Sequence, residues 1–230
     1  MNIKPRPLLQ VAIDALSTQQ ALDTLGQIHP YVDIVEIGTP LIIEEGLTAL
    51  ETLKARFPDK KYLADLKIMD AGKLEAMSAF KRGADIVTVL AAADDLTIRG
   101  ALEAAEGYGG LIMADLINVH DLATRAMELC ALKLPIICLH TASDRRGPGK
   151  DMLHSLEIVR PVVSCQLAIA GGLTSDIIGQ ALLKGADILV VGSGITNQRD
   201  PREVAFTIMK KLNELANLGQ GHAADGGERR

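Results

Sequence analysis

Short apolar runs recur along the chain at intervals of about 25 residues, which is room for one strand, one helix and two loops. The runs are nearly continuous and rich in Val, Ile and Leu, as expected for parallel strands that are covered on both faces. The pattern predicts eight strands: Leu8–Asp14, Val32–Gly38, Lys61–Lys67, Asp85–Ala91, Leu111–Ile117, Pro135–Thr141, Gln166–Gly172 and Asp187–Ser193.

The segments between these runs have helical periodicity. Leu47, Leu50 and Leu53, for example, share one face of a helix, and Asp200-Pro201 is a typical helix start. Strict alternation of strands and helices favours a closed (β/α)8 TIM barrel, with an open doubly wound sheet as the alternative. The predicted helices are Thr18–Ile28, Glu44–Phe57, Lys73–Arg82, Asp94–Glu106, Val119–Leu132, Asp151–Val159, Ser175–Lys184 and Pro201–Leu215.

A short motif occurs twice, once in each half of the chain. Arg82-Gly83-Ala84-Asp85-Ile86-Val87 is similar to Lys184-Gly185-Ala186-Asp187-Ile188-Leu189. Both segments predict a helix that ends at glycine and is followed by a strand. We expect one barrel domain over residues 1–217. Residues 218–230 are Gly-rich and polar, and we predict a disordered tail there.

Composition excludes several classes of protein. A formal net charge of −5 and few aromatic residues argue against nucleic-acid binding. No apolar run approaches the roughly 20 residues that span a bilayer, and the first residues lack the apolar core of a signal peptide. Cys130, Cys138 and Cys165 have no metal-type spacing, so we interpret them as reduced core thiols. A cytoplasmic protein without membrane partners is expected.

Polar residues gather where the predicted strands end. The carboxyl ends of the strands form the active site of such barrels. Asp65 and Lys67 are two residues apart, so they share one face of a strand, and Asp70 follows on the next loop. A buried lysine between carboxylates needs a partner or a substrate, which favours a catalytic site. The strand-end residues are Asp14, Glu36, Asp65, Lys67, Asp94-Asp95, Asp115, His140, Gly171-Gly172 and Gly192-Ser193.

The residue types indicate specific roles. Glu36 and Asp65 offer the hard oxygen ligands that suit Mg²⁺, although Glu36 paired only with Lys67 is the alternative. His140 suits general acid–base chemistry, and a structural imidazole is the alternative. The carboxylate of Asp14 suits a hydrogen bond to a substrate hydroxyl, or an interaction that holds Lys67 in position. The glycine pairs after the last two strands match the frequent phosphate site of this fold, or else form ligand-free turns.

Several motifs in order resemble one known family. Asp65-x-Lys67-x-x-Asp70 resembles the signature of the orotidine-monophosphate decarboxylase suprafamily. Four further segments look like those of the 3-hexulose-6-phosphate synthases in that suprafamily. They are Glu36-Ile37-Gly38-Thr39-Pro40, Asp115-Leu116-Ile117-Asn118-Val119, Cys138-Leu139-His140-Thr141 and Ala168-Ile169-Ala170-Gly171-Gly172. The resemblance covers Leu8 to Leu215 and implies a ribulose-phosphate-binding barrel.

The resemblance implies a Mg²⁺-dependent aldol addition of formaldehyde to D-ribulose 5-phosphate through a 1,2-enediolate. Glu36 and Asp65 would hold Mg²⁺, Lys67 would stabilise the enediolate, and His140 is the implied base. Asp70 would act across a homodimer with shared active sites, and a 6-phospho-3-hexuloisomerase is the implied pathway partner. The implied substrate-binding and phosphate-binding residues are Asp14, Thr39, Asp115, Gly171, Gly172, Gly192 and Ser193.

Other functions remain open at this stage. The related 3-keto-L-gulonate-6-phosphate decarboxylases typically have Glu, Arg and Arg where this chain has Asp115, Ser143 and Ser193. Those departures favour the synthase, although Arg145-Arg146 lie close enough in sequence to replace one arginine. An isomerase similar to ribulose-phosphate epimerase would need two flanking aspartates, and a non-catalytic sugar-phosphate sensor would be expected to lose Lys67 or a metal carboxylate.

Overall fold

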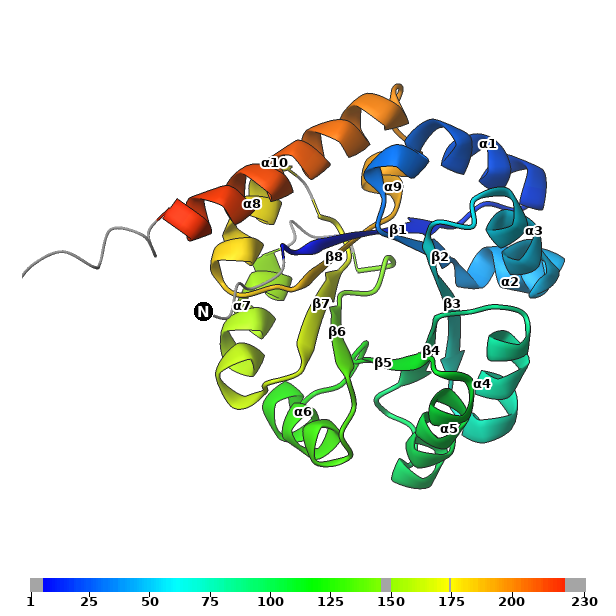
Figure 1. The fold of residues 1–230 in the computed structure, drawn as a ribbon. Helices are drawn as coiled ribbons and strands as arrows, with labels where there is room; N and C mark the ends of the chain where they lie inside the picture. Colours follow the sequence, from blue (N-terminus) through cyan, green and yellow to red (C-terminus); the bar gives the residue numbers. More distant parts are fainter. Residues whose placement is uncertain (1–5, 146–149, 174, 222–230) are drawn as a thin grey trace, which may run out of the picture.

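Eight parallel strands close into a barrel in the computed structural model, which describes residues 6–145, 150–173 and 175–221 (Figure 1). Each strand pairs with its neighbours in sequence, and β1 pairs with β8, so the predicted TIM barrel is confirmed and the open sheet is excluded. The strands are β1 (Leu8–Ile13), β2 (Ile34–Ile37), β3 (Lys61–Ile68), β4 (Ile86–Leu90), β5 (Leu111–Asp115), β6 (Ile136–His140), β7 (Gln166–Ala170) and β8 (Ile188–Val191).

Helices surround the barrel on the outside, as Figure 1 shows. The predicted helix over residues 44–57 is wrong, because two helices cover residues 39–56 and Gly46, at φ +66°, ends the first of them. The helices are α1 (Thr18–Ile28), α2 (Thr39–Glu45), α3 (Thr48–Arg56), α4 (Gly72–Lys81), α5 (Asp95–Tyr108), α6 (Leu122–Ala131), α7 (Lys150–Val159), α8 (Ser175–Leu183), α9 (Ser193–Thr196) and α10 (Pro201–Gly221), with 3₁₀ turns η1 (His29–Tyr31) and η2 (Arg160–Val162).

The last helix extends further than the sequence pattern predicts. Asp200 caps its start, where the carboxylate accepts a hydrogen bond of 2.9 Å from the Glu203 backbone N–H. The helix continues to Gly221, so no structural break marks the domain boundary expected after residue 217. The rest of the predicted tail, residues 222–230, lies outside the described residues. None of the helices within the described ranges is long and apolar enough to cross a membrane.

The repeated Gly-Ala-Asp motif has a structural purpose at the amino-terminal end of the barrel. Gly83 and Gly185 adopt φ of +94° and +91°, which turns the chain sharply into the next strand. Asp85 and Asp187, the aspartates of the two motifs, accept hydrogen bonds of 2.9 Å from the backbone N–H groups of Tyr62 and Leu167 at the start of the neighbouring strands. Asp33 does the same for Leu9 N, although its local sequence differs. These carboxylates also pair with Lys54, Arg160 and Arg6, respectively.

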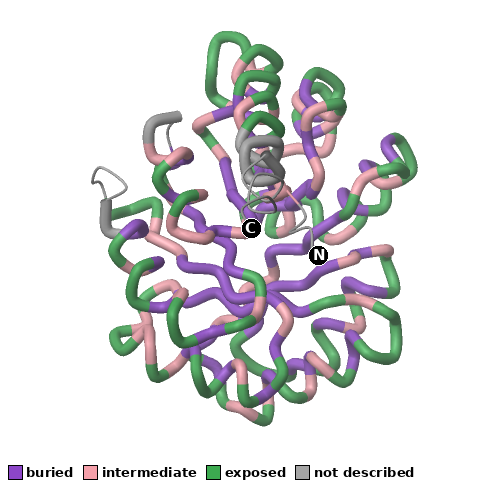
Figure 2. The backbone as a smooth tube through the Cα atoms, turned by 60° about the vertical axis from the view of Figure 1, so that its left-hand side comes forward, coloured by how far each residue is buried: buried purple, intermediate pink, exposed green. Residues whose placement is uncertain are grey.

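Apolar side chains fill two separate regions. The larger core lies between the outer face of the sheet and the helices, and the second lies inside the barrel. Figure 2 shows the buried backbone concentrated along the strands, with exposed residues on the outer helices. The buried polar residues within the described ranges come from five neighbouring strands: Gln10, Glu36, Asp65, Thr88 and Asp115. Buried polar groups therefore concentrate at one end of the barrel interior.

We predict that Asp85→Ala lowers the free energy of unfolding by about 1–3 kcal/mol, because it leaves the Tyr62 N–H without its acceptor and Lys54 without its ion-pair partner. Asp59→Ala is the control. Asp59 is two-thirds exposed and forms an ion pair with its neighbour Lys60, so its loss changes stability by less than about 1 kcal/mol. Urea unfolding of both variants measures the difference, and equal midpoints would contradict the proposed role of the motif.

Candidate active site

A cavity of about 710 Å³ opens at the carboxyl end of the barrel. Strand ends and the loops after them line it, as this fold dictates. Of the residues predicted to act in catalysis, metal binding or substrate binding, all but Asp70 line it: Asp14, Glu36, Thr39, Asp65, Lys67, Asp115, His140, Gly171, Gly172, Gly192 and Ser193. Asp94 and Asp95 do not line it. Asp94 caps α5 through Leu96 N, and Asp95 pairs with Arg125.

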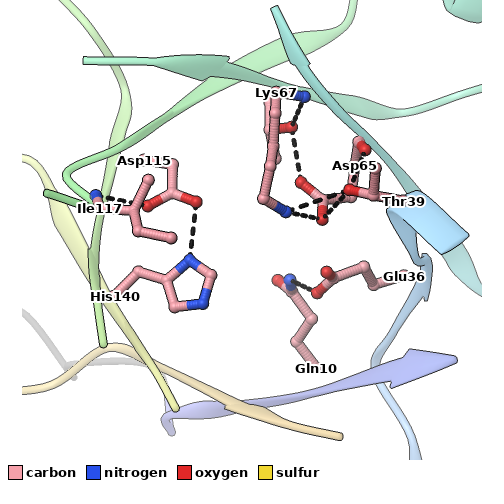
Figure 3. Close-up of polar contacts among 9 residues, drawn as sticks. Gln10, Glu36, Thr39, Asp65, Lys67, Asp115, Ile117 and His140 are labelled. Carbon is pink, nitrogen blue, oxygen red and sulfur yellow. Dashed lines mark hydrogen bonds and ion pairs between the residues drawn. The ribbon is translucent and has the colours of Figure 1, made fainter. Parts of the chain in front are cut away.

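Lys67 and Asp65 form an ion pair at the centre of the site (Figure 3). The two residues meet as predicted, but simple strand alternation is not the reason. The register of β3 shifts between Ala64 and Ile68, and Lys67 adopts a left-handed backbone with φ of +48°. The Lys67 backbone N–H donates a hydrogen bond of 2.9 Å to the Thr88 hydroxyl on β4. This hydrogen bond holds the left-handed conformation in place.

Two threonines fix both oxygens of the Asp65 carboxylate. The Thr88 hydroxyl donates to Oδ1 at 2.8 Å, and the Thr39 hydroxyl lies 2.9 Å from Oδ2. Lys67 Nζ also lies 3.1 Å from Thr39 Oγ1. Burial alone lowers the pKa of Lys67, but the adjacent Asp65, helped by Asp115 and Glu36, raises it overall, so the lysine stays charged.

Glu36 lies next to this pair and is buried on β2. Burial, together with the charge of Asp65, raises the pKa of Glu36 to about 8. Gln10 on β1 donates a hydrogen bond of 2.6 Å to Glu36 Oε2 (Figure 3). The local negative charge is therefore larger than Lys67 alone balances.

The donor set fits a hard divalent cation. Glu36 and Asp65 supply carboxylate oxygens, and Oε1 of buried Gln10 has no hydrogen-bond partner in the described structure. No group of three or more His, Cys, Asp or Glu side chains arranged to hold a metal occurs within the described ranges. Mg²⁺ does not need such a cage, since it takes one or two carboxylates together with water and substrate oxygens. A magnesium site on Glu36 and Asp65 stays a prediction that this geometry accommodates.

His140 lies on the opposite side of the cavity, at the end of β6. Its Nδ1 is 2.7 Å from Asp115 Oδ2, and Asp115 Oδ1 accepts a hydrogen bond of 2.9 Å from the Ile117 backbone N–H (Figure 3). A carboxylate at Nδ1 favours the tautomer with the proton there, which leaves Nε2 free to accept a proton. Asp115, predicted to bind substrate, therefore also orients His140.

Asp14 stands at the rim, just beyond β1. Partial desolvation at the mouth and the charge of Asp65 raise the pKa of Asp14, while Lys67 and His140 oppose the shift. Gly38 makes this position possible, because a Cβ there would lie 2.1 Å from Asp14 Oδ1. Asp14 is thus placed to contact a ligand above the buried carboxylates.

Glycine turns close the other side of the mouth. Gly171 and Gly172 have φ of +104° and +64°, and a Cβ on Gly171 would lie 2.4 Å from the Thr141 carbonyl oxygen. Gly192 precedes α9, a short helix that the sequence pattern did not reveal. Loops after strands seven and eight with a short extra helix form the usual phosphate site of this fold.

Asp70 is the exception among the predicted site residues. It is exposed, it does not line the cavity, and its carboxylate accepts a hydrogen bond of 2.7 Å from Ala71 N. No contact with Lys67 is among its described interactions. The structure of one chain therefore does not bring Asp70 into the site.

Sequence reasoning missed Gln10 and Thr88, and it undervalued Cys138. All three line the cavity and are buried. Burial, with the charges of Asp115, Glu36 and Asp65, raises the pKa of the Cys138 thiol well above its usual value. A polar residue at an alternating position inside an apolar strand run was the available signal for Gln10 and Thr88. Cys130 and Cys165 lie elsewhere, with their sulfur atoms 3.5 Å apart.

Comparison with known proteins agrees with this geometry. Residues 7–208 match the Orotidine 5'-phosphate decarboxylase / HUMPS family. The chain belongs to this family. The 3-hexulose-6-phosphate synthase of Bacillus subtilis (strain 168) is 43% identical over 205 residues, which are 89% of this chain and 97% of that relative. The resemblance noted from the motifs is confirmed.

Solved structures of the OMPdecase/HUMPS family give the same result. A crystal structure of a 3-hexulose-6-phosphate synthase is similar with a TM-score of 0.83 and 42% identity, over 88% of this chain and 98% of that one. A KGPDC from Streptococcus mutans, solved in complex with D-R5P, has a TM-score of 0.83 but 26% identity, over 90% and 98% of the two chains. This chain is thus more similar in sequence to that synthase than to the KGPDC, although the two TM-scores are equal.

We predict that Glu36 makes stability fall as pH rises in chelator-treated protein. The unfolded chain releases this proton near the ordinary value of 4.5, whereas the folded chain keeps it to about 8. Between these values the unfolded state binds fewer protons, so the free energy of unfolding decreases with pH. Melting curves from about pH 5 to about pH 8 should show wild type losing stability relative to Glu36→Gln.

Glu44→Gln, at an exposed glutamate on α2, serves as the control and should follow wild type. Parallel pH profiles for wild type and Glu36→Gln would contradict the raised pKa of Glu36.

Proposed function

We propose that this chain is a 3-hexulose-6-phosphate synthase, an aldehyde-lyase that adds formaldehyde to D-ribulose 5-phosphate. The observation that carries the proposal is 43% identity over nearly the full length of a named synthase, together with a cavity lined by the predicted charged residues other than Asp70. The product would be D-arabino-3-hexulose 6-phosphate.

The sugar phosphate would bind across the mouth of the barrel. Backbone N–H groups around Gly171, Gly172, Gly192 and Ser193 would hold the phosphate, since glycines allow close approach. Asp14 would bond a hydroxyl of the sugar, and the carbonyl end would then reach the buried group of Glu36, Asp65 and Lys67.

His140 is the proposed base. With Asp115 at Nδ1, the free Nε2 would take a proton from C1 of the ketose, and the electron pair would form a 1,2-enediolate. The enediolate C1 would attack the carbon of formaldehyde, forming the new carbon–carbon bond, and the resulting alkoxide would take back a proton from His140. General acid–base groups of this type contribute about 10²- to 10⁴-fold in rate.

Lys67 would stabilise the negative charge that develops on the enediolate. Its ammonium group is already held by Asp65 and Thr39, so no reorganisation is needed during the reaction. Mg²⁺ held by Glu36 and Asp65 would polarise the ketose oxygens and share that charge. Removing either charge source is therefore expected to impair the proton-abstraction step.

A second candidate is 3-keto-L-gulonate-6-phosphate decarboxylase activity, which would use a similar enediolate. Arg145 favours it, because this exposed arginine lines the cavity near Ser143. Arg146 lies outside the described residues. Asp115, Ser143 and Ser193 favour the synthase, since two of these positions lack the arginines typical of the decarboxylases and all three line the cavity.

We also propose a homodimer in which Asp70 enters the partner's site. Asp70 is exposed beside apolar Met69 and Leu74, which are 53% and 68% exposed, and Leu96 on neighbouring α5 is 78% exposed. The starts of α4 and α5 touch, because a Cβ on Gly72 would meet the Thr97 carbonyl oxygen at 1.9 Å. An apolar surface of this kind around a carboxylate suits a subunit contact. A cytoplasmic location and a 6-phospho-3-hexuloisomerase as pathway partner stay predictions.

The direct test is formaldehyde consumption by purified protein with ribulose 5-phosphate and Mg²⁺. We expect wild type to consume formaldehyde, Lys67→Ala to lose about 10²-fold or more in kcat, and excess EDTA to abolish turnover. Lys210→Ala, at an exposed lysine on α10, is the matched control and should retain activity. Rapid CO₂ release from 3-keto-L-gulonate 6-phosphate without formaldehyde uptake would instead favour the decarboxylase.

Mixed dimers test the position of Asp70. Lys67→Ala and Asp70→Asn are each expected to be inactive alone. If Asp70 acts in the partner's site, random reassociation of the two variants restores one intact site in each hybrid, or about a quarter of wild-type activity. No recovery in hybrids verified by native mass spectrometry, or a fully active monomer by light scattering, would contradict the shared site.

A further inference from the structure

One buried side-chain polar atom has no hydrogen-bond partner in the described part of the chain, and it is Oε1 of Gln10. Gln10 is 1% exposed, lies inside the barrel on β1, and lines the active-site cavity. Buried amide oxygens are almost always paired in native proteins. This atom therefore calls for a ligand that the chain itself does not supply.

The orientation of the amide follows from its other contact. Nε2 of Gln10 donates a hydrogen bond of 2.6 Å to Glu36 Oε2, and a Glu36 carboxylate that binds a cation is ionised and can only accept. Glu36 therefore fixes the amide with its N–H toward the carboxylate and its oxygen away from it. Figure 3 shows Gln10 and Glu36 side by side, joined by this hydrogen bond.

We infer that Gln10 is a positioning residue of the cation site, holding Glu36 through Nε2 while its Oε1 faces the coordination sphere of the bound cation. The inference rests on the proposed function, because that function places Mg²⁺ on Glu36 and Asp65. Mg²⁺ keeps several waters when it binds proteins, and these waters are hydrogen-bond donors. An amide oxygen facing them would gain the partner that it lacks in the chain alone.

A purely structural glutamine would behave differently on substitution. If Gln10 only supported the barrel, its loss would lower stability and leave cation affinity unchanged. If it serves the cation, an apolar side chain of similar length also lowers cation affinity, in addition to the stability lost with the Nε2 hydrogen bond to Glu36. Cation affinity, and not stability, therefore distinguishes the two roles.

The experiment measures Mn²⁺ binding by electron paramagnetic resonance and melting temperature in EDTA, without substrate. We expect Gln10→Met to bind Mn²⁺ about 10- to 100-fold more weakly, with a modestly lower melting temperature from the loss of the Nε2 hydrogen bond to Glu36. Ile34→Val is the packing control, since Ile34 is the register partner of Gln10 and lies inside the barrel, and its Mn²⁺ affinity should equal that of wild type.

Gln10→Glu provides a second test if the methionine variant does not fold. It keeps an oxygen at this position and adds a charge beside Glu36, so it should melt lower in EDTA and recover stability when Mn²⁺ is added. Equal Mn²⁺ stabilisation of Gln10→Glu and wild type would overturn the inference.

Glu36→Gln separates this inference from the proposed function. If Glu36→Gln weakens Mn²⁺ binding but Gln10→Met does not, the role of Gln10 is wrong and the cation site stands. If Glu36→Gln has no effect, or wild type does not bind Mn²⁺, the cation site fails and the role of Gln10 fails with it.

Discussion

The ion pair between Lys67 and Asp65 is the interaction on which the site depends. An ammonium group this far inside a barrel is stable only with a carboxylate beside it, and Asp65 in turn needs the hydroxyls of Thr39 and Thr88. These contacts come from β3, β4 and the start of α2, so the pair also ties three elements together. The left-handed backbone at Lys67 persists because this network holds it.

Around this ion pair, carboxyl groups outnumber the lysine ammonium group that faces them. Glu36 and Asp115 are buried near the same lysine, and Asp14 stands at the rim. One lysine does not neutralise four carboxyl groups, so the site retains either protons or a cation. Burial, together with that excess of negative charge, raises the pKa of Glu36. A site of this kind has a strong electrostatic attraction for a divalent ion and little for a phosphate, which agrees with the proposal that the glycine turns across the mouth hold the phosphate.

Stability and chemistry occupy opposite ends of the barrel. Asp33, Asp85 and Asp187 secure the strand starts through backbone hydrogen bonds and ion pairs. The strand ends carry the buried carboxylates and the strained Lys67. Since the stabilising contacts lie away from the cavity, the mouth can hold an energetically costly arrangement without the barrel opening.

Much of this was predictable because repetition makes the pattern strong. Eight apolar runs predicted the barrel, and strand-end charges predicted most of the charged residues that line the cavity. The register shift in β3 was not predictable, because it arises from the pairing of Lys67 N with Thr88 on another strand. The split between α2 and α3 depends on Gly46, which a helical face alone does not reveal. Gln10 was overlooked because a single polar residue in a strand reads as an interruption of a core.

Cys138 shows a further effect of the same electrostatics. Its thiol lies inside the barrel among Asp115, Glu36 and Asp65, which together with burial keep it protonated. A thiolate is the reactive form of cysteine toward electrophilic carbonyl compounds. The carboxylates around Lys67 thus also keep the thiol in the cavity wall in its less nucleophilic form, which would limit its reaction with the formaldehyde of the proposed reaction.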